Sequence, residues 1–246
     1  MSQTKTNFDS RREAFLDTAD ELFIELGYEN TSIERLISRL GVSKGAFYHY
    51  FRSKSDLLDA AIYRLLSRYE AKFAEIVESD SPATKKLQSF VNSIFSAKTA
   101  DRELATQIGD LLLNEANAVL MSRHRYAASQ LFVPIFEKII VQGVKAGEFN
   151  VESPSRVARI IWDIGQSWDE NAYRVLFKTE EAMPELNTLL KLNNSYTLAI
   201  ERVLGAKEGC LCLDSKLLEP WIETAHLHRA KNKPNSYAME KTKALN

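Results

Sequence analysis

The chain has 246 residues, and 45% of them are hydrophobic, which is enough for a folded core. Its formal net charge is −1 and its isoelectric point is about 6.5. Those values exclude a protein that is basic overall and coats nucleic acid. Any contact with nucleic acid must therefore come from a local basic patch. Nine glycines and six prolines are few for this length, and alternating strand-like patterns are hard to find. The composition predicts an all-α protein.

Several functional classes find no support in the sequence. The first ten residues lack the charged-then-apolar pattern of a signal peptide, and no run approaches the roughly 18 apolar residues of a membrane span. We therefore expect a cytoplasmic protein without a membrane partner. The G-x-S-x-G, H-E-x-x-H, P-loop and G-x-G-x-x-G strings are all missing, and the four histidines have no evident partners. We predict no enzymatic activity and no cofactor.

A first helix is predicted from Asp9, a plausible N-cap, to Gly27, a residue suited to a helix end. Residues 1–8 are predicted to form a disordered arm. One face of the helix carries apolar residues at helical spacing: Phe15, Ala19, Leu22, Phe23 and Leu26. This helix would brace the segment that follows.

Residues 31–58 have the pattern of a helix-turn-helix. Thr31 and Glu34 show the spacing of a capping box, which predicts a helix start at Thr31. Gly41 allows a turn at little steric cost, and Ser43 is placed to cap a second helix over about 44–50. Ser53 is placed to cap a third, whose N-terminal amides favour an anion such as a DNA phosphate.

Positive charge is concentrated in this segment. Residues 35–54 contain no Asp or Glu and five cations: Arg35, Arg39, Lys44, Arg52 and Lys54. A run of cations is more often a solvated face than a nucleic-acid site. The Tyr48-His49-Tyr50 run favours DNA, because tyrosine hydroxyls can donate to phosphates whereas two exposed tyrosines on a short helix have little folding rationale.

This segment resembles the DNA-binding motif of the TetR family of transcriptional regulators. The resemblance lies in Gly27-Tyr28, Thr31, Gly41-Val42-Ser43, the run from Gly45 to Phe51, and Lys54 followed by Leu57-Leu58. It implies phosphate contacts by Tyr48, Tyr50 and Lys54, base contacts by Lys44, Gly45 and His49, and anchoring by Phe47 and Phe51. From the residues alone, His49 is equally compatible with a plain surface histidine. The full set of predicted DNA-binding residues is Thr31, Ser32, Ser43, Lys44, Gly45, Tyr48, His49, Tyr50 and Lys54.

The rest of the chain continues in helical periods. Residues 57–76 are predicted to form a long helix that links the N-terminal segment to a second body, and Pro82 is well placed at the start of the next helix. Further helices are predicted over 87–95, 104–121, 131–144, 153–177 and 186–204. We divide the chain into a three-helix DNA-binding domain (1–56), a larger helical regulatory and dimerisation domain (57–206) and a polar C-terminal tail (207–246).

The resemblance also implies a dimer and a ligand pocket. The apolar stripes on 153–177 and 186–204 would pair with their copies in a homodimer, although they could instead face their own core. The predicted interface residues are Ile160, Ile164, Trp168, Leu189, Asn193, Thr197 and Ile200. A pocket for a small-molecule effector of unknown identity would be lined by aromatic and sulfur-containing side chains: Phe90, Phe95, Met121, Tyr126, Phe132, Phe136, Trp162 and Trp168. Aromatic residues at helical spacing more often belong to the core than to a ligand pocket.

The predicted tail contains a possible short helix over 215–228. Cys210, Cys212, His226 and His228 are metal-type ligands, but one intervening residue within each pair is not the usual zinc spacing. His226 and His228 would also point apart on a helix. We therefore predict no metal site.

The sequence predicts a TetR-like repressor that binds a palindromic operator as a homodimer and is released by a small molecule. The alternative is a TetR-fold activator or architectural DNA-binding protein without such an inducer. A helical interaction module that never binds DNA is disfavoured by Tyr48, Tyr50 and Lys54.

Overall fold

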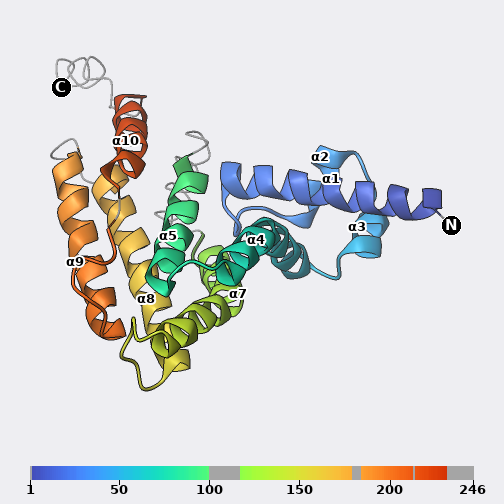
Figure 1. Ribbon diagram of the computed structural model, residues 1–246. Coiled ribbons are helices and arrows are strands. Elements are labelled where there is room, and N and C mark those ends of the chain that lie inside the picture. The colour runs from blue at the N-terminus through green and yellow to red at the C-terminus, as the bar shows by residue number, and fades with distance from the viewer. Residues whose placement is uncertain (1, 100–116, 179–183, 213, 232–246) are drawn as a thin grey trace, which may run out of the picture.

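The computed structural model describes residues 2–99, 117–178, 184–212 and 214–231, and within those ranges every regular element is helical. An N-terminal head lies at one end of the molecule and a larger helical body at the other (Figure 1). The expected all-α architecture, with a helix-turn-helix head and a larger helical body, is confirmed. The elements are α1 (Ser2–Leu26), α2 (Ile33–Leu40), α3 (Lys44–Tyr50), α4 (Lys54–Glu78), α5 (Ala83–Thr99), α7 (Ala118–Lys145), α8 (Pro154–Tyr173), a π-helical turn η2 (Arg174–Lys178), α9 (Leu186–Leu204), a 3-10 turn η3 (Ser215–Leu217) and α10 (Glu219–Lys231).

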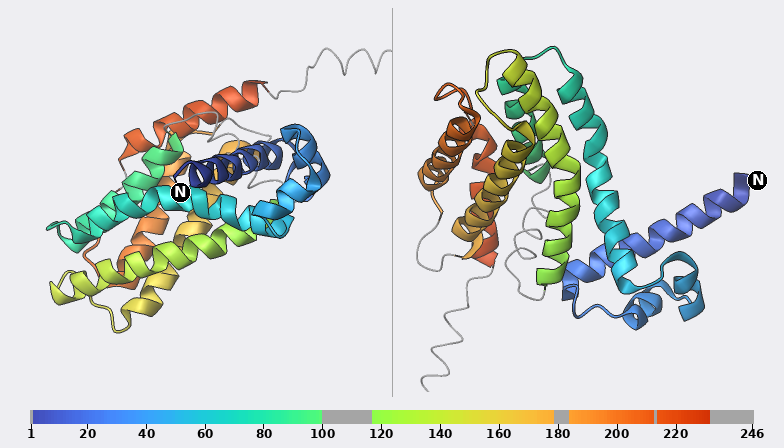
Figure 2. Two further views of the ribbon diagram at one scale, coloured as in Figure 1. Left: turned by 90° about the vertical axis from the view of Figure 1, so that its right-hand side faces the viewer. Right: turned by 90° about the horizontal axis from the view of Figure 1, so that it is seen from below.

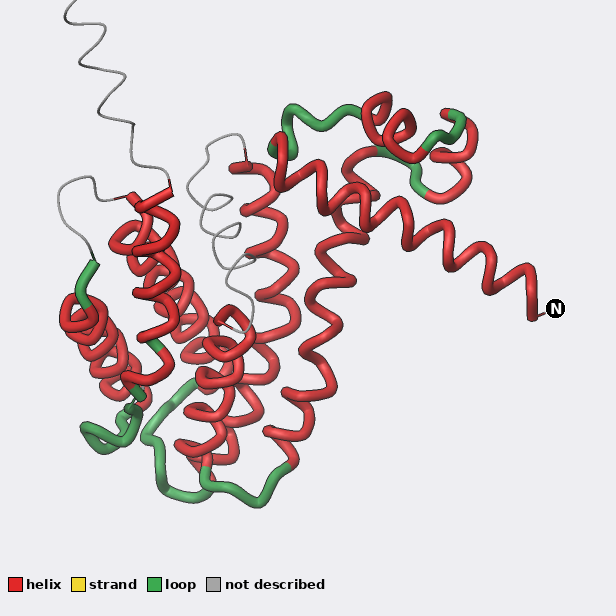
Figure 3. The backbone as a smooth tube through the Cα atoms, turned by 90° about the horizontal axis from the view of Figure 1, so that it is seen from above, coloured by secondary structure: helices red, strands yellow, loops and turns green. Residues whose placement is uncertain are grey.

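The head is built from α1, α2, α3 and the start of α4 (Figure 3). Its core is a continuous apolar cluster from all four helices: Phe15, Leu16, Ala19, Leu22, Phe23, Leu36, Phe47, Phe51, Leu57 and Leu58. Gly41 ends α2 at φ +66°, in the left-handed region that glycine enters without a steric penalty. The predicted turn between α2 and α3 is therefore observed.

Two details of the head differ from expectation. The first helix begins at Ser2 rather than Asp9. No Gly or Pro interrupts residues 2–8, and the Phe8 ring packs on Tyr50 at a centroid distance of 4.7 Å, so the helix can extend. The cap of α2 is Ser32 rather than Thr31, since the Arg35 backbone N–H donates to Ser32 Oγ (3.2 Å).

α4 joins the head to the body. Its 25 residues span roughly 37 Å at the usual rise of an α-helix, and the boundary that we placed between residues 56 and 57 falls inside it. Arg64 ties it to α1 by donating to Glu13 (2.8 Å), Asp17 (2.7 Å) and Asp20 (2.6 Å). Partial burial lowers the pKa of the Arg64 guanidinium, but the bonds to the three carboxylates outweigh burial and raise it.

α7 is the central helix of the body and packs against α4, α5 and α8. By length and composition it is apolar enough to cross a membrane, which the sequence analysis did not anticipate. Its apolar residues, however, include Phe132, Phe136, Ile139 and Ile140, which are buried in the body core. A core helix of a globular protein satisfies the same test. The helix predicted over 104–121 lies mostly outside the described residues.

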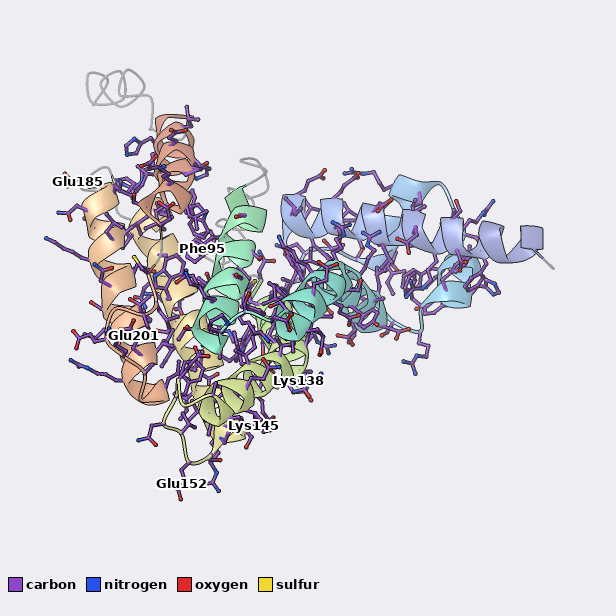
Figure 4. The ribbon with its side chains drawn as sticks, in the orientation of Figure 1. Phe95, Lys138, Lys145, Glu152, Glu185 and Glu201 are labelled. Atoms are coloured by element: carbon purple, nitrogen blue, oxygen red, sulfur yellow. The ribbon has the colours of Figure 1, made fainter. Side chains whose placement is uncertain are left out.

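The C-terminal segment is more ordered than the polar tail we expected. α10 packs on the body through a second apolar cluster that includes Phe95, Trp168, Leu218, Trp221 and Ala225. Phe95 projects from α5 and its ring contacts both Trp168 (4.7 Å) and Trp221 (5.6 Å) (Figure 4). The aromatic side chain of Trp221 in α10 is thus buried against the body. Residues 232–246 lie outside the described part of the chain.

The possible metal ligands of the segment are used in other ways. His226 Nε2 lies 2.9 Å from the Pro184 carbonyl, and the His228 ring packs edge-on against Phe177. Among the described residues, no group of three or more His, Cys, Asp or Glu side chains is placed to hold a metal ion.

Glu148, in the loop after α7, caps α5. Its carboxylate accepts the backbone N–H groups of Ala83 (2.8 Å) and Thr84 (3.0 Å) and the Thr84 hydroxyl (2.9 Å). Burial raises the pKa of Glu148, but these bonds outweigh burial and hold it below its ordinary value of 4.5. The charged carboxylate therefore stabilises the folded state.

We expect Glu148→Gln to lower the free energy of unfolding by about 1–2 kcal/mol near neutral pH, because it removes a charge-assisted cap. The folded-state pKa is depressed, so this contribution is present above the unfolded value of 4.5 and is lost as the pH falls through the folded value. Denaturant unfolding at neutral and acidic pH measures the difference. Glu152→Gln is the matched control, because Glu152 is exposed in the same loop between α7 and α8 (Figure 4). A gap that stays constant into acid would contradict the charged cap.

Candidate functional site

The outward face of α3 is the candidate DNA-reading surface. Ser43 caps the helix, since the Ala46 N–H donates to its hydroxyl (3.2 Å). Phe47 and Phe51 are buried and pack against Phe15, at 5.9 and 6.0 Å between ring centroids. This fixes the rotation of α3 and turns an exposed face outward, which contains Lys44, Gly45, Tyr48 and His49.

The three residues of the Tyr-His-Tyr run have different environments. The Tyr48 side chain is 49% exposed, so its hydroxyl is available to a partner. Tyr50 is half-buried and packs on Phe15 (5.5 Å) and Phe8 (4.7 Å). His49 is exposed, with its ring edge against Phe8 at 5.6 Å. Tyr50 is therefore as much a packing residue as a contact residue.

Most of the cations in the patch are already paired within the chain. Arg39 Nη2 lies 2.8 Å from Glu25, Arg52 Nη2 lies 3.0 Å from Asp56, and Lys44 Nζ lies 3.2 Å from Glu34. These pairs are largely solvent-exposed, and exposed ion pairs contribute little to stability. The cations can therefore exchange a carboxylate for a phosphate at small cost. Arg35 is exposed, and no hydrogen bond or ion pair of its side chain occurs among the described residues.

Lys54 holds the head together, a role that the sequence analysis missed. Its Nζ donates to the backbone carbonyls of Tyr28 (2.8 Å) and Glu29 (3.4 Å) and lies 4.1 Å from the centroid of the Tyr28 ring. The ammonium group has three donors, so at most one is left for a phosphate. We expected a phosphate contact here; in this structure Lys54 instead fastens α4 to the loop between α1 and α2.

Thr31 is not at the DNA-reading surface. It is 1% exposed, and its hydroxyl donates to the carbonyls of Gly27 (2.9 Å) and Leu22 (3.1 Å). The side chain thus satisfies the C-terminal carbonyls of α1. Ser32, one residue later, takes the capping position and is only half-buried. Ser43 is exposed at the start of α3.

A second connection joins the head directly to the start of α7. Asn117 occupies the N-cap position of α7 but makes no cap there. Its Oδ1 instead accepts the backbone N–H of Tyr28 at 3.0 Å, in a buried site. Arg123, one and a half turns further on, donates to both oxygens of Asp59 on α4 (2.8 and 2.9 Å). Figure 2 shows the start of α7 next to the end of α1. The same residue, Tyr28, therefore bonds to α7 and to Lys54.

The body contains an apolar cavity of about 130 Å³ between α5, α8 and α9. Five of the predicted pocket residues line it: Phe90, Phe95, Phe136, Trp162 and Trp168. The sequence analysis missed several of its aliphatic walls, because they look like ordinary core positions: Leu87, Val91, Ile94 and Ile161. Leu211 reaches it because the buried Glu201 carboxylate accepts the Leu211 N–H (2.7 Å).

Three predicted pocket residues do not line this cavity. Phe132 lies in the core against Phe73 (5.3 Å) and Trp162 (5.5 Å). Tyr126 is 68% exposed on α7. Met121 is half-buried near the start of the same helix. Helical spacing alone could not separate core, surface and cavity positions along α7.

The predicted dimer stripe faces inward in the chain itself. Trp168, Leu189 and Asn193 are buried. Ile164, Thr197 and Ile200 line the cavity, as do Trp168 and Asn193. Buried side chains cannot meet a second copy, so Trp168, Leu189 and Asn193 are removed from the interface prediction. Ile160, at 45% exposed, remains available. Most of the predicted interface residues therefore face the core or the cavity of their own chain, as in the alternative interpretation.

We expect Asn117→Ala to lower the free energy of unfolding by about 1–3 kcal/mol, because it leaves the buried Tyr28 N–H without an acceptor. Hydrogen exchange of the Tyr28 amide should also become faster. Ser122→Ala is the control, since Ser122 is exposed on α7. Unchanged exchange at Tyr28 would show that this bond does not hold the head.

Comparison with known proteins agrees with this geometry. The sequence profile described as "Bacterial regulatory proteins, tetR family" matches residues 15–61. The chain is 25% identical over 144 residues to the fatty acid metabolism regulator protein of Bacillus subtilis (strain 168), covering 58% of this chain and 73% of that protein. It is 26% identical over 153 residues to the transcriptional repressor KstR2 of Rhodococcus jostii (strain RHA1), covering 61% of this chain and 74% of the repressor.

The fold also has solved counterparts. FadR from Bacillus subtilis, in complex with stearoyl-CoA, superimposes with a TM-score of 0.56 at 20% identity, covering 78% of this chain and 97% of that one. At this identity the match concerns the fold alone. Together, the matched profile over residues 15–61, the named regulators and the shared fold support a DNA-binding transcriptional regulator of the TetR family.

Proposed function

We propose that the protein represses transcription by occupying a two-fold symmetric operator as a homodimer, and that a small molecule bound in the body cavity releases it. The observation that carries this proposal is the α3 surface: Phe47 and Phe51 are buried, and Lys44, Tyr48 and His49 are turned outward together. A polar, partly cationic helix face held by a rigid apolar back suits the major groove.

The proposed contacts divide by chemistry. Tyr48 donates from an exposed hydroxyl to a phosphate, and Lys44 and His49 meet base edges. Arg35 adds positive charge on α2 and is free to turn toward the backbone of the duplex. Lys54, already bonded to Tyr28, keeps the start of α4 in place and has at most one donor for phosphate. The DNA surface is thus centred on α3 and α2.

A dimer is part of the proposal because one short helix reads only a few base pairs, and useful specificity calls for two heads on one site. Of the predicted interface residues, Ile160 is the one still exposed on α8 among the described positions. We place the interface on the outer surface of the body that contains it. The protein is proposed to act in the cytoplasm, where the DNA is.

Release by an effector is supported by the arrangement of the cavity. α5 forms one of its walls, and α5 packs against both α4 and α7. Both of those helices bond to the head, α4 through Arg64 and Lys54 and α7 through Asn117. A ligand that shifts α5 can therefore change the position of the head, provided that it binds the two arrangements with different affinity.

The test of the whole proposal is selection of bound sequences from a random duplex pool by the purified protein. We expect enrichment of an inverted repeat, which would establish a dimeric sequence reader and supply the operator. No enrichment at low salt, in a protein that is folded, would overturn it.

We expect Lys44→Gln to weaken binding and to reduce the slope of log affinity against log salt by roughly one unit, because the Lys44 ammonium in the groove also neutralises nearby phosphate charge. Its ion pair with Glu34 is exposed, so the variant should unfold like the parent. Lys138→Gln is the matched control, because Lys138 is exposed on α7 in the body (Figure 4). Equal slopes in the two variants would remove Lys44 from the DNA surface.

We expect His49→Ala to relax the preference at one base position in each half-site while leaving the rest of the selected sequence unchanged. The effect should be about 1–3 kcal/mol of discrimination at that position. Repeating the selection with the variant measures it. A preference profile identical to that of the parent would show that His49 is only a surface residue.

A further inference from the structure

The size of the body cavity limits what it can hold. Its volume is about 130 Å³, close to the ~150 Å³ of an apolar protein cavity that accepts benzene. The aromatic side chains on its walls include Phe90, Phe95 and Trp162. In this structure the space therefore suits one ring-sized apolar group, which is far smaller than a long acyl chain.

One wall residue does not fit an apolar site. Asn193 is 5% exposed and lines the cavity from α9. Its side-chain amide offers two donors and one acceptor, and no hydrogen bond of this amide occurs among the described residues. Neither amide atom is among the fully buried polar atoms, so the group opens onto the cavity, where no described protein group bonds to it. Such a group in a cavity wall points to a missing polar partner.

Most of the neighbouring polar side chains are already engaged, although the buried indole N–H of Trp168 has no hydrogen-bond partner among the described residues. The Tyr196 hydroxyl bonds with Ser167 Oγ (2.9 Å) and Asn171 (3.0 Å). The Thr197 hydroxyl donates to the backbone carbonyls of Asn193 and Asn194, both at 3.1 Å. Gln88 accepts from the Cys212 N–H (2.8 Å) and donates to Asn92. Gln166 is half-buried and can be solvated. Asn193 is thus the amide left for a ligand.

Charge on the wall restricts the ligand further. Within the described part of the chain, no Lys, Arg or His lines the cavity, and Asp169 is its one carboxylate. The negative charge of Asp169 also acts on Tyr173, where burial first and this charge second raise the phenol pKa. A carboxylate or phosphate ligand would find no counter-ion on these walls, and Asp169 already has a partner within the protein, so it does not call for a cationic ligand.

We propose that the effector is a small neutral molecule, about one aromatic ring in size, that presents a carboxamide or a similar donor–acceptor group to the Asn193 side chain. This rests on the effector-controlled release proposed above and names the ligand class of that cavity. Asn193 then sets specificity, because a site built to hydrogen-bond a ligand rejects analogues that lack the group.

Four probes of nearly the same shape test the ligand class: benzamide, cumene, benzoate and benzamidine. They place a neutral amide, an apolar, an anionic and a cationic group on the same ring. All three tryptophans of the chain report on binding, since Trp162 and Trp168 line the cavity and Trp221 lies 5.9 Å from Trp168. We expect benzamide to bind tightest in a tryptophan-fluorescence titration. Tightest binding by any other probe, or no binding by benzamide, would overturn the proposal.

Asn193→Leu tests the residue. It should weaken benzamide binding by about tenfold while cumene binding changes little, because only the amide loses a partner. Without ligand, its melting temperature should equal or exceed that of the parent, since an unpartnered buried amide is replaced by an apolar group. A lower melting temperature would mean that the amide already has a structural partner, which would overturn the proposal. Equal losses for both probes would also overturn it.

The effector role is measured separately, by release of the selected operator. Benzamide that binds in the titration without releasing the operator would leave the ligand class standing and contradict effector-controlled release. Operator binding that no probe in the series affects, together with an unresponsive titration, would contradict the ligand class and leave DNA recognition intact. The two proposals therefore fail in different ways.

Discussion

α4 is buried at both ends, and the rest of the molecule depends on that constraint. Leu57 and Leu58 lie in the core of the head, while Phe73 and Val77 lie in the core of the body. Moving either end of this rigid helix exposes apolar surface at the other unless a partner element moves with it. A change in the body is therefore passed to the head through packing.

Hydrogen bonds and ion pairs also connect the helices of the head to those of the body. Arg64 binds three carboxylates of α1 and thereby connects α1 to α4. Tyr28 lies where the supports meet, because its N–H bonds to Asn117 at the start of α7 and its carbonyl bonds to Lys54 at the start of α4. The loop between α1 and α2 is thereby held from the body side and from the DNA side. The side chains of α3 are thus presented by a head that is bonded to α4 and to the start of α7.

The cavity and the head draw on the same helices. α5 lines the cavity and packs on α4, and Phe136 of α7 lines it as well. Most of the stripe that the sequence assigned to a dimer interface faces this cavity or the core beside it. The residues with the strongest apolar spacing on α8 and α9 were thus used inside the chain, which leaves mainly polar and charged side chains, with Ile160, on the outer face of α8.

Local chemistry was sufficient to predict the all-helical fold, the helix-turn-helix and the exposed face of α3. The spacing of apolar residues, including Phe47 and Phe51, and a glycine suited to positive φ are features of a few neighbouring residues, so they can be read along the chain. The family resemblance rests on that same stretch.

Only the tertiary structure decided the roles of Lys54, Thr31, Asn117 and Asn193. Lys54 and Asn117 bond to Tyr28, 26 and 89 residues away along the sequence, and no local pattern reveals such partners. Thr31 caps the carbonyls of α1 rather than α2, because the neighbouring Ser32 offers an equivalent hydroxyl. Asn193 lies on an apolar stripe of α9. Whether that stripe faces a second chain, the core or a cavity depends on how α5, α8 and α9 pack. Periodicity determines that a helix has an apolar face, whereas the other helices determine what that face contacts.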